Sequence, residues 1–225
     1  RDIVLNEKIP GLKTKRLRYS RGNFENLFRD SHFDTVYHLG RLSHGGVIQN
    51  GIAERLDISV VGTNRILDLS LRFKVKKIII LSTFHVYGAL SDNSIFLAED
   101  SPLKASIKFP ELRDVVEMDQ TCTTWMWKYQ GEIDSVILRP CNIIGEQINN
   151  SMTKFLTSPL ALRPIDYNPS FQFIHEFDMA SILERAIEEL PTGIYNVATD
   201  EFIAFREALD ISGARGIPLR LRCPG

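Results

Sequence analysis

The 225-residue chain has few cysteines and no long run of apolar residues. Cys122, Cys141 and Cys223 are odd in number and never form a Cys-x-x-Cys pair, which argues against a disulfide framework and a zinc site. No apolar stretch approaches the roughly 20 residues that cross a bilayer, and residues 1–10 lack the layout of a signal peptide. We therefore expect a cytoplasmic protein that has no membrane partner.

A strong charge of one sign is also absent. The chain has 27 basic and 28 acidic residues, so its formal net charge is -1. Such a balance gives no general attraction to nucleic acid. With 44% hydrophobic residues the chain can form one sizeable core, or a core with a small appended lobe. We expect no nucleic-acid partner.

The clearest positive signal is an alternation of short apolar runs with longer helical patterns, which predicts a parallel sheet covered by helices. Residues 33–39 are expected to form a strand and residues 53–73 an amphipathic helix. The β-branched run at 76–81 then completes a first βαβ unit. A second unit is expected from a helix over 112–128 and a strand over 135–138.

The C-terminal third is expected to be less regular. Residues 149–171 contain several prolines and predict a loop-rich part of a smaller lobe. An amphipathic pattern over 179–190 predicts a helix, and residues 193–198 predict a further strand. We expect residues 1–148 to form the core, and residues 149–225 to supply the lobe together with this late helix and strand.

Six segments of the chain match motifs that occur in the same order in one protein family. They are Phe33–Gly40, Ser59–Thr63, Leu81–Gly88, Leu138–Gly145, Phe173–Asp178 and Tyr195–Val197. Each match is weak alone, but together they resemble the extended short-chain dehydrogenase/reductases of the NAD-dependent epimerase/dehydratase type. The resemblance implies a Rossmann-like parallel sheet flanked by helices, with NAD or NADP as cofactor. It also implies a sugar-like or other small hydroxyl or carbonyl substrate.

The family's opening strand and its glycine-rich loop have no counterpart in the sequence. In the family that loop holds the dinucleotide pyrophosphate at a helix N-terminus. We expect this segment to precede residue 1 in the natural protein.

The family's catalytic Tyr-x-x-x-Lys motif is altered. Alignment on Val116 and Glu117 places Phe109 and Arg113 at the two positions. A phenyl ring cannot carry a proton, so the usual general base is lost, whereas arginine keeps the positive charge. Tyr87 and Tyr129 are conceivable substitutes for the missing phenol.

Two further departures concern the substrate. Ser59 stands where the resemblance predicts asparagine. Phe171 stands where many nucleotide-sugar enzymes have an arginine that grips the diphosphate, so a nucleotide-sugar substrate is in doubt. Thr83, by contrast, retains a hydroxyl at the position of the family's catalytic serine or threonine.

These matches define the candidate site. Thr83 and Arg113 are the expected catalytic residues. The expected cofactor-binding residues are Asn23, Phe24, Leu39, Gly40, Pro140, Cys141 and Asn142. His38 and His175 are interpreted as packing or turn residues, and no metal site is expected.

Two functions remain open. The first is an NAD(P)-dependent oxidoreductase or isomerase, in which Thr83 orients the substrate. The second is a protein of the same fold that has lost turnover and serves as a cofactor sensor or scaffold, as the change to Phe109 suggests. Trp125 and Trp127 cannot share one face of their helix, so one is expected in the core and the other exposed or at an interface. The resemblance implies a homodimer, because in related enzymes this region of helix can join the dimer bundle.

Overall fold

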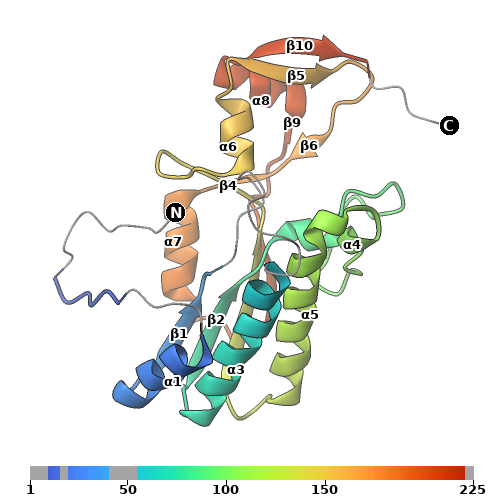
Figure 1. Ribbon diagram of the computed structural model, residues 1–225. Coiled ribbons are helices and arrows are strands. Elements are labelled where there is room, and N and C mark those ends of the chain that lie inside the picture. Colours follow the sequence, from blue (N-terminus) through green and yellow to red (C-terminus); the bar gives the residue numbers. More distant parts are fainter. Residues whose placement is uncertain (1–9, 16–19, 41–54, 221–225) are drawn as a thin grey trace.

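The computed structural model describes residues 10–15, 20–40 and 55–220. Its centre is a parallel sheet of four strands in the order β1-β2-β3-β8 (Figure 1). The strands are β1 (Thr35–His38), β2 (Lys77–Leu81), β3 (Asp134–Pro140) and β8 (Gly193–Val197). Each lies within or next to a strand expected from the apolar pattern, so the predicted α/β fold is confirmed.

The inner strand β2 shows why this sheet forms. Ile78, Ile79 and Ile80 are each 0% exposed, and β-branched side chains fit a strand that is buried on both faces. Ile79 is in register with Tyr37 of β1 and with Val136 of β3. Because successive side chains point to opposite faces, Ile78 and Ile80 enter one core and Ile79 enters another.

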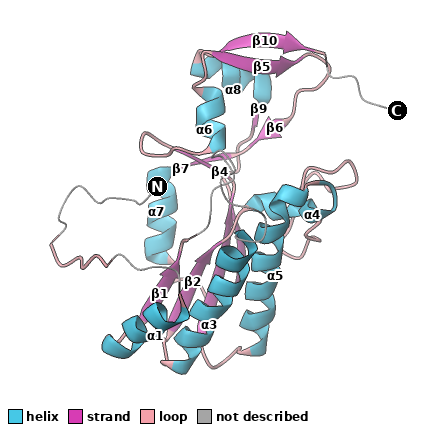
Figure 2. Cartoon of the chain, in the orientation of Figure 1, coloured by secondary structure: helices cyan, strands magenta, loops and turns pink. Residues whose placement is uncertain are grey.

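Three helices cover one face of the sheet (Figure 2). They are α1 (Arg21–Asp30), α3 (Gly62–Arg72) and α5 (Arg113–Lys128). A π-helical turn, η1 (Asp57–Val61), precedes α3, so the helix expected over 53–73 is irregular in its described part. The predicted helix over 112–128 agrees with α5.

The other face is covered by α7 (Glu176–Arg185). Its N-terminus begins earlier than the pattern predicted, because the His175 side chain accepts a hydrogen bond from the backbone N–H of Phe177 and caps the helix. The segment beyond the C-terminus of α7 is bound by Lys77, whose ammonium donates to the carbonyls of Ile187 and Leu190 at 2.7 Å each. This lysine ties the turn after α7 to the start of β2.

A smaller lobe lies beyond the carboxyl ends of the strands (Figure 1). It contains α6 (Ser151–Leu156), β5 (Leu160–Pro164), β6 (Ser170–Phe171), β9 (Ile203–Ala204), α8 (Phe205–Ser212) and β10 (Arg215–Leu219). The expectation of an irregular stretch over 149–171 is therefore wrong in part. Asn150 and Thr153 form a capping box that starts α6, a local signal that a count of prolines overlooks.

Short elements connect the sheet to this lobe. They are η2 (Phe84–Tyr87), α4 (Ala105–Lys108), η3 (Pro110–Leu112), β4 (Asn142–Ile144) and β7 (Phe173–His175). Strands β4 and β7 pair in parallel at the base of the lobe.

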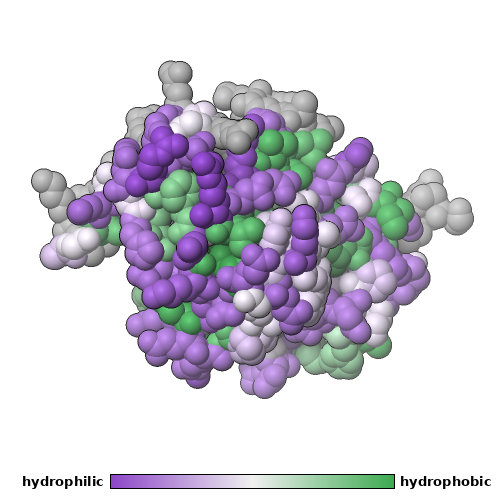
Figure 3. Space-filling view, turned by 90° about the horizontal axis from the view of Figure 1, so that it is seen from below, coloured by the Kyte–Doolittle hydropathy of each residue, from purple (hydrophilic) through white to green (hydrophobic). Residues whose placement is uncertain are grey.

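The face opposite the lobe is mostly hydrophilic, and hydrophobic residues appear there only in small separate groups (Figure 3). Within the described residues, no helix is long and apolar enough to cross a membrane.

Candidate functional site

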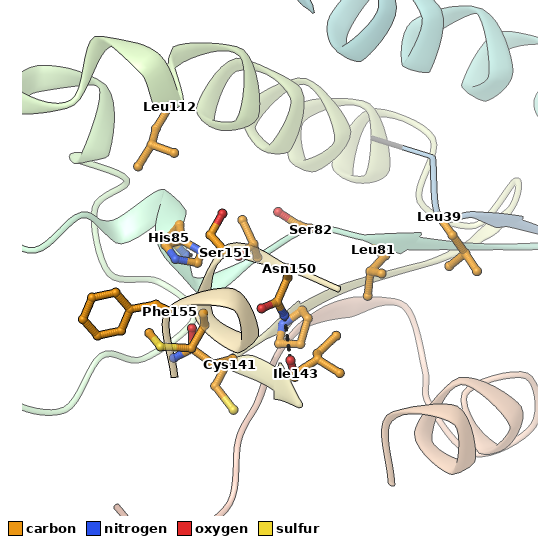
Figure 4. Close-up of a pocket in the computed structure, with 14 residues that line it drawn as sticks. Leu39, Leu81, Ser82, His85, Leu112, Cys141, Ile143, Asn150, Ser151 and Phe155 are labelled. Carbon is orange, nitrogen blue, oxygen red and sulfur yellow. Dashed lines mark hydrogen bonds between the residues drawn. The ribbon is translucent and has the colours of Figure 1, made fainter. Parts of the chain in front are cut away.

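A cavity of about 360 Å³ lies at the carboxyl ends of β1, β2 and β3, between the sheet and α6 (Figure 4). In open α/β sheets this edge is where ligands bind, because the loops that follow the strands diverge there. The cavity therefore occupies the position at which the fold itself favours a binding site.

Consecutive residues after each strand form the floor. Leu39 follows β1, and the end of β2 contributes Leu81, Ser82 and Thr83. The end of β3 contributes Pro140, Cys141 and Asn142. The structure thus brings together five of the predicted residues, namely Thr83, Leu39, Pro140, Cys141 and Asn142.

Thr83 has a partner that the sequence did not single out. Its Oγ1 lies 2.8 Å from Nδ1 of His85, and His85 also lines the cavity. Thr83 caps the short helix η2, since its Oγ1 also accepts from the backbone N–H of His85 at 3.4 Å. The two side chains are therefore held together by the turn that carries both, two positions apart.

The small lobe supplies the opposite wall. Asn150, Ser151, Met152 and Phe155 face the cavity from the start of α6. The Asn150 amide donates to the carbonyl of Ile143 at 2.7 Å, which fixes α6 against β4 (Figure 4). These residues lie in the stretch expected to be irregular, so sequence reasoning missed them.

The altered catalytic motif does not reach the cavity. Arg113 donates from Nε to Glu117 at 2.6 Å, and its side chain is 63% exposed. Phe109 precedes η3 and is not among the lining residues. Of residues 109–113, Leu112 lines the cavity, and its apolar side chain can neither donate nor accept a proton.

The remaining predicted residues lie elsewhere. Asn23 and Phe24 belong to α1, and Phe24 packs against the core under α1, α3 and α5. Gly40 is exposed, next to the lining residue Leu39. None of these three contributes to the cavity walls.

The two conceivable replacement phenols are also displaced from it. Tyr87 is 2% exposed, and its hydroxyl donates to Asn196 Oδ1 at 2.7 Å. Burial raises the pKa of Tyr87, which disfavours a phenolate. Tyr129 follows the far end of α5 and stacks on Trp125. Neither tyrosine lines the cavity, so neither replaces the family's general base there.

A buried ionic network supports the floor of the site. Arg139 binds Asp119 through Nε at 3.0 Å and Nη2 at 2.6 Å, and Asp119 also accepts from the hydroxyl of Ser82 at 2.5 Å. Arg139 further donates to the Tyr87 hydroxyl at 2.8 Å. The network fixes Ser82, the residue that precedes Thr83, from below.

The cavity walls are neutral and largely apolar. Among the residues that line it, His85 and Cys141 are the ionisable ones, and burial raises the pKa of the Cys141 thiol. No Lys, Arg, Asp or Glu is part of the lining. Such walls fit the nicotinamide end of a dinucleotide, which combines a flat ring with an amide that forms hydrogen bonds. The described residues contain no cluster of ligands that could hold a metal ion.

Solved structures of sugar-modifying enzymes share this fold. The UDP-glucose 4-epimerase of Thermus thermophilus, in complex with NAD, aligns with a TM-score of 0.72 at 19% identity over 89% of this chain and 69% of its own. WbmG of Bordetella bronchiseptica, with NAD and UDP, aligns with a TM-score of 0.72 at 20% identity over 96% and 69%. The dTDP-glucose 4,6-dehydratase of Bacillus anthracis aligns at 0.71 with 16% identity over 90% and 65%.

Sequence comparison leads to the same family. The protein Rv0501 of Mycobacterium tuberculosis, itself uncharacterized, is 23% identical over 210 residues, which are 91% of this chain and 55% of that protein. The chain thus spans about half the length of the curated relatives it matches. Residues 14–198 match the model of the NAD dependent epimerase/dehydratase family, and the chain belongs to this family.

Proposed function

We propose that this protein binds an NAD-type dinucleotide over the strand ends and transfers a hydride to or from a sugar-like or other small hydroxyl or carbonyl substrate. The observation that carries the proposal is the placement of the Thr83 hydroxyl in a neutral cavity at the carboxyl end of β2. The UDP-glucose 4-epimerase and the dTDP-glucose 4,6-dehydratase named above contain NAD, which supports the same chemistry.

The floor of the cavity would contact the cofactor, and the wall formed by the start of α6 would contact the substrate. Pro140, Cys141 and Leu39 would contact the cofactor from the floor. Asn150 and Phe155 of α6 would contact the substrate and exclude water. A bound NAD-type cofactor would supply the chemistry of hydride transfer. Thr83 would orient the substrate oxygen by hydrogen bonding from Oγ1.

The two parts of the chain would have different roles. Residues 1–148 would bind the cofactor, and residues 149–225 would supply the substrate side. Both NAD and NADP remain candidates. A cytoplasmic location is supported by Cys122 and Cys141, which are free and buried thiols, whereas Cys223 lies outside the described residues. A homodimer would form through the exposed face of α5, along its groove with α3 and next to Trp127, which is 53% exposed, whereas Trp125 is buried.

A second function is favoured by one observation. The described residues that line the cavity include no tyrosine, and Phe109 and Arg113 lie outside its walls. The rival proposal is therefore a cofactor sensor or scaffold that binds the dinucleotide without turnover.

Turnover separates the two functions. The protein is incubated with NAD or NADP and with UDP-glucose, dTDP-glucose or free sugars, and the near-ultraviolet absorbance of reduced nicotinamide is recorded. We expect reduction by at least one substrate, and a loss of about 100-fold in Thr83→Val, because a positioned proton-transfer group contributes about that factor. The matched control is Thr14→Val, at an exposed position that precedes α1. Dinucleotide binding without any reduction of the cofactor, and without conversion of any of these sugars when the products are separated by chromatography, would favour the sensor.

A further inference from the structure

Two contacts within its own turn hold the His85 ring at the cavity. Its Nδ1 lies 2.8 Å from the Thr83 hydroxyl, and its ring contacts the Phe84 ring at a tilt of 40°, with centroids 4.1 Å apart. The helix η2 that carries it is packed against α4 and α5. The imidazole therefore has a defined position next to the Thr83 hydroxyl, and both residues line the cavity.

The reaction of the proposed function requires a group that takes a proton, because an alcohol that loses a hydride also loses its hydroxyl proton. Among the residues that line the cavity, Cys141 is a poor acceptor, since burial raises the pKa of its thiol. Serine, threonine and asparagine do not hold an additional proton near neutral pH. His85 is the lining side chain whose type titrates in that range.

The charged residues of the neighbouring helices do not take this role. Those on α4 and α5, the helices packed against η2, are absent from the cavity lining. They are Lys108, Arg113, Asp114, Glu117, Asp119 and Lys128. Asp119 is held by Arg139, and Arg113 is held by Glu117.

We propose that His85 is the proton acceptor of this site and that it acts through the hydroxyl of Thr83; this inference rests on the proposed function. The substrate O–H bond breaks and its proton passes to Thr83 Oγ1, while the proton of Thr83 passes to His85 Nδ1. The C–H electron pair leaves the carbinol carbon as a hydride to the nicotinamide, and a C=O bond forms. In the reverse direction His85 returns the proton, so the step balances.

The arrangement replaces the altered motif with a different residue. Phe109, which alignment places at the position of the family's phenol, does not line the cavity, and the lining residue of this segment is the apolar Leu112. His85 instead reaches the cavity from η2, next to the hydroxyl that it assists. In this proposal the proton acceptor lies on η2, the turn that Thr83 caps, and not on α5.

Nitrogen-15 NMR of the protein with labelled histidines tests the hydrogen bond between Thr83 and His85. The relay requires that neutral His85 carries its proton on Nε2 and leaves Nδ1 as an acceptor. We expect this tautomer in the wild type, with its signal assigned by His85→Gln, and a changed Nδ1 shift in Thr83→Val. His32, an exposed residue beyond α1, serves as the control signal. A proton on Nδ1 of neutral His85 would overturn the proposal.

Cofactor addition gives the second readout. With saturating NAD we expect the His85 signals to shift and those of His32 to stay. His85→Gln should bind NAD about as tightly as the wild type but reduce it about 100-fold more slowly, without the acid limb of the pH profile. Bound NAD that leaves the His85 signals unchanged, or an unaltered reduction rate in His85→Gln, contradicts the inference. Absence of NAD binding would contradict the proposed function instead. The tautomer of His85 would then still test whether Thr83 donates its proton to His85 Nδ1.

Discussion

Arg139 and Asp119 form a two-point ion pair inside the protein, with 2% and 0% of their side chains exposed. The pair lies under the candidate site and holds Ser82 through an oxygen of Asp119. It joins β3 to α5, so it fixes the floor of the cavity relative to the helix that covers it.

Loss of one partner should strongly destabilise the protein. Asp119→Ala leaves the Arg139 guanidinium buried without its counter-charge, and we expect the free energy of unfolding to fall by about 3–5 kcal/mol. Urea unfolding measures the change. Glu117→Ala removes the partner of exposed Arg113 and should cost much less stability than Asp119→Ala, because solvent screens that pair. Similar costs for the two variants would contradict this account.

His38 should make stability depend on pH. It is buried against Thr63, and burial lowers the pKa of His38 from 6.5 to about 4. The unfolded chain therefore binds a proton at this position between pH 6.5 and pH 4 that the folded chain does not. Its contribution, about 3 kcal/mol at most, is present above pH 6.5 and is lost as pH falls toward 4.

Thermal unfolding at a series of pH values checks this window. His38→Gln lacks the titrating group, so the difference in stability between variant and wild type should shrink as pH falls from 6.5 to 4. A difference that stays constant over this range would show that His38 is not the group responsible.

Gly88, which follows the site-bearing helix η2, should tolerate no side chain. Its φ is 75° and its ψ is 160°, a region open essentially to glycine, and an added Cβ would lie 2.9 Å from the Cα of Ala105. We expect Gly88→Ala to destabilise the protein by about 2–4 kcal/mol in urea unfolding. Gly131 has a φ of 88° but an added Cβ there would meet no atom within 4 Å, so Gly131→Ala should cost only about 1 kcal/mol. Equal costs at the two positions would contradict the close approach at Gly88.

A charge in the groove between α3 and α5 tests the proposed dimer. Thr124 is exposed and lines this groove with Asn64 and Gln120. If the groove is the interface, Thr124→Arg should convert a dimer into a monomer in light-scattering measurements, because an unpaired buried charge is costly. Gln130→Arg adds the same charge beyond the end of α5 and should leave the mass unchanged. A wild-type monomer would contradict the dimer.

The sequence predicted the fold because the relevant signals are local. The run around Ile79 is buried on both faces, and such a run is recognisable from its β-branched residues alone. The ordered motifs then predicted the family, and the match over residues 14–198 confirms it. The positions of Thr83 and Cys141 at strand ends followed from the same reasoning.

The rest of the site depends on contacts between distant segments. Asn150 and Phe155 lie on a short helix whose capping residues are its only clear signal. His85 stands two residues after Thr83, but only the geometry of η2 shows that the two side chains meet. Arg113 was expected to take part in catalysis from its alignment, whereas the structure pairs it with Glu117 at the surface.

Calorimetric titration with NAD and NADP tests the central claim, that the cavity at the strand ends binds the dinucleotide. The wild type is compared with Leu39→Trp, which places a large ring at the cavity, and with Leu162→Trp, a similarly exposed position of the small lobe. We predict saturable binding to the wild type and to Leu162→Trp, and binding at least about tenfold weaker to Leu39→Trp, a difference of about 1.4 kcal/mol. No binding to the folded wild type, or equal binding to all three proteins, would contradict the account.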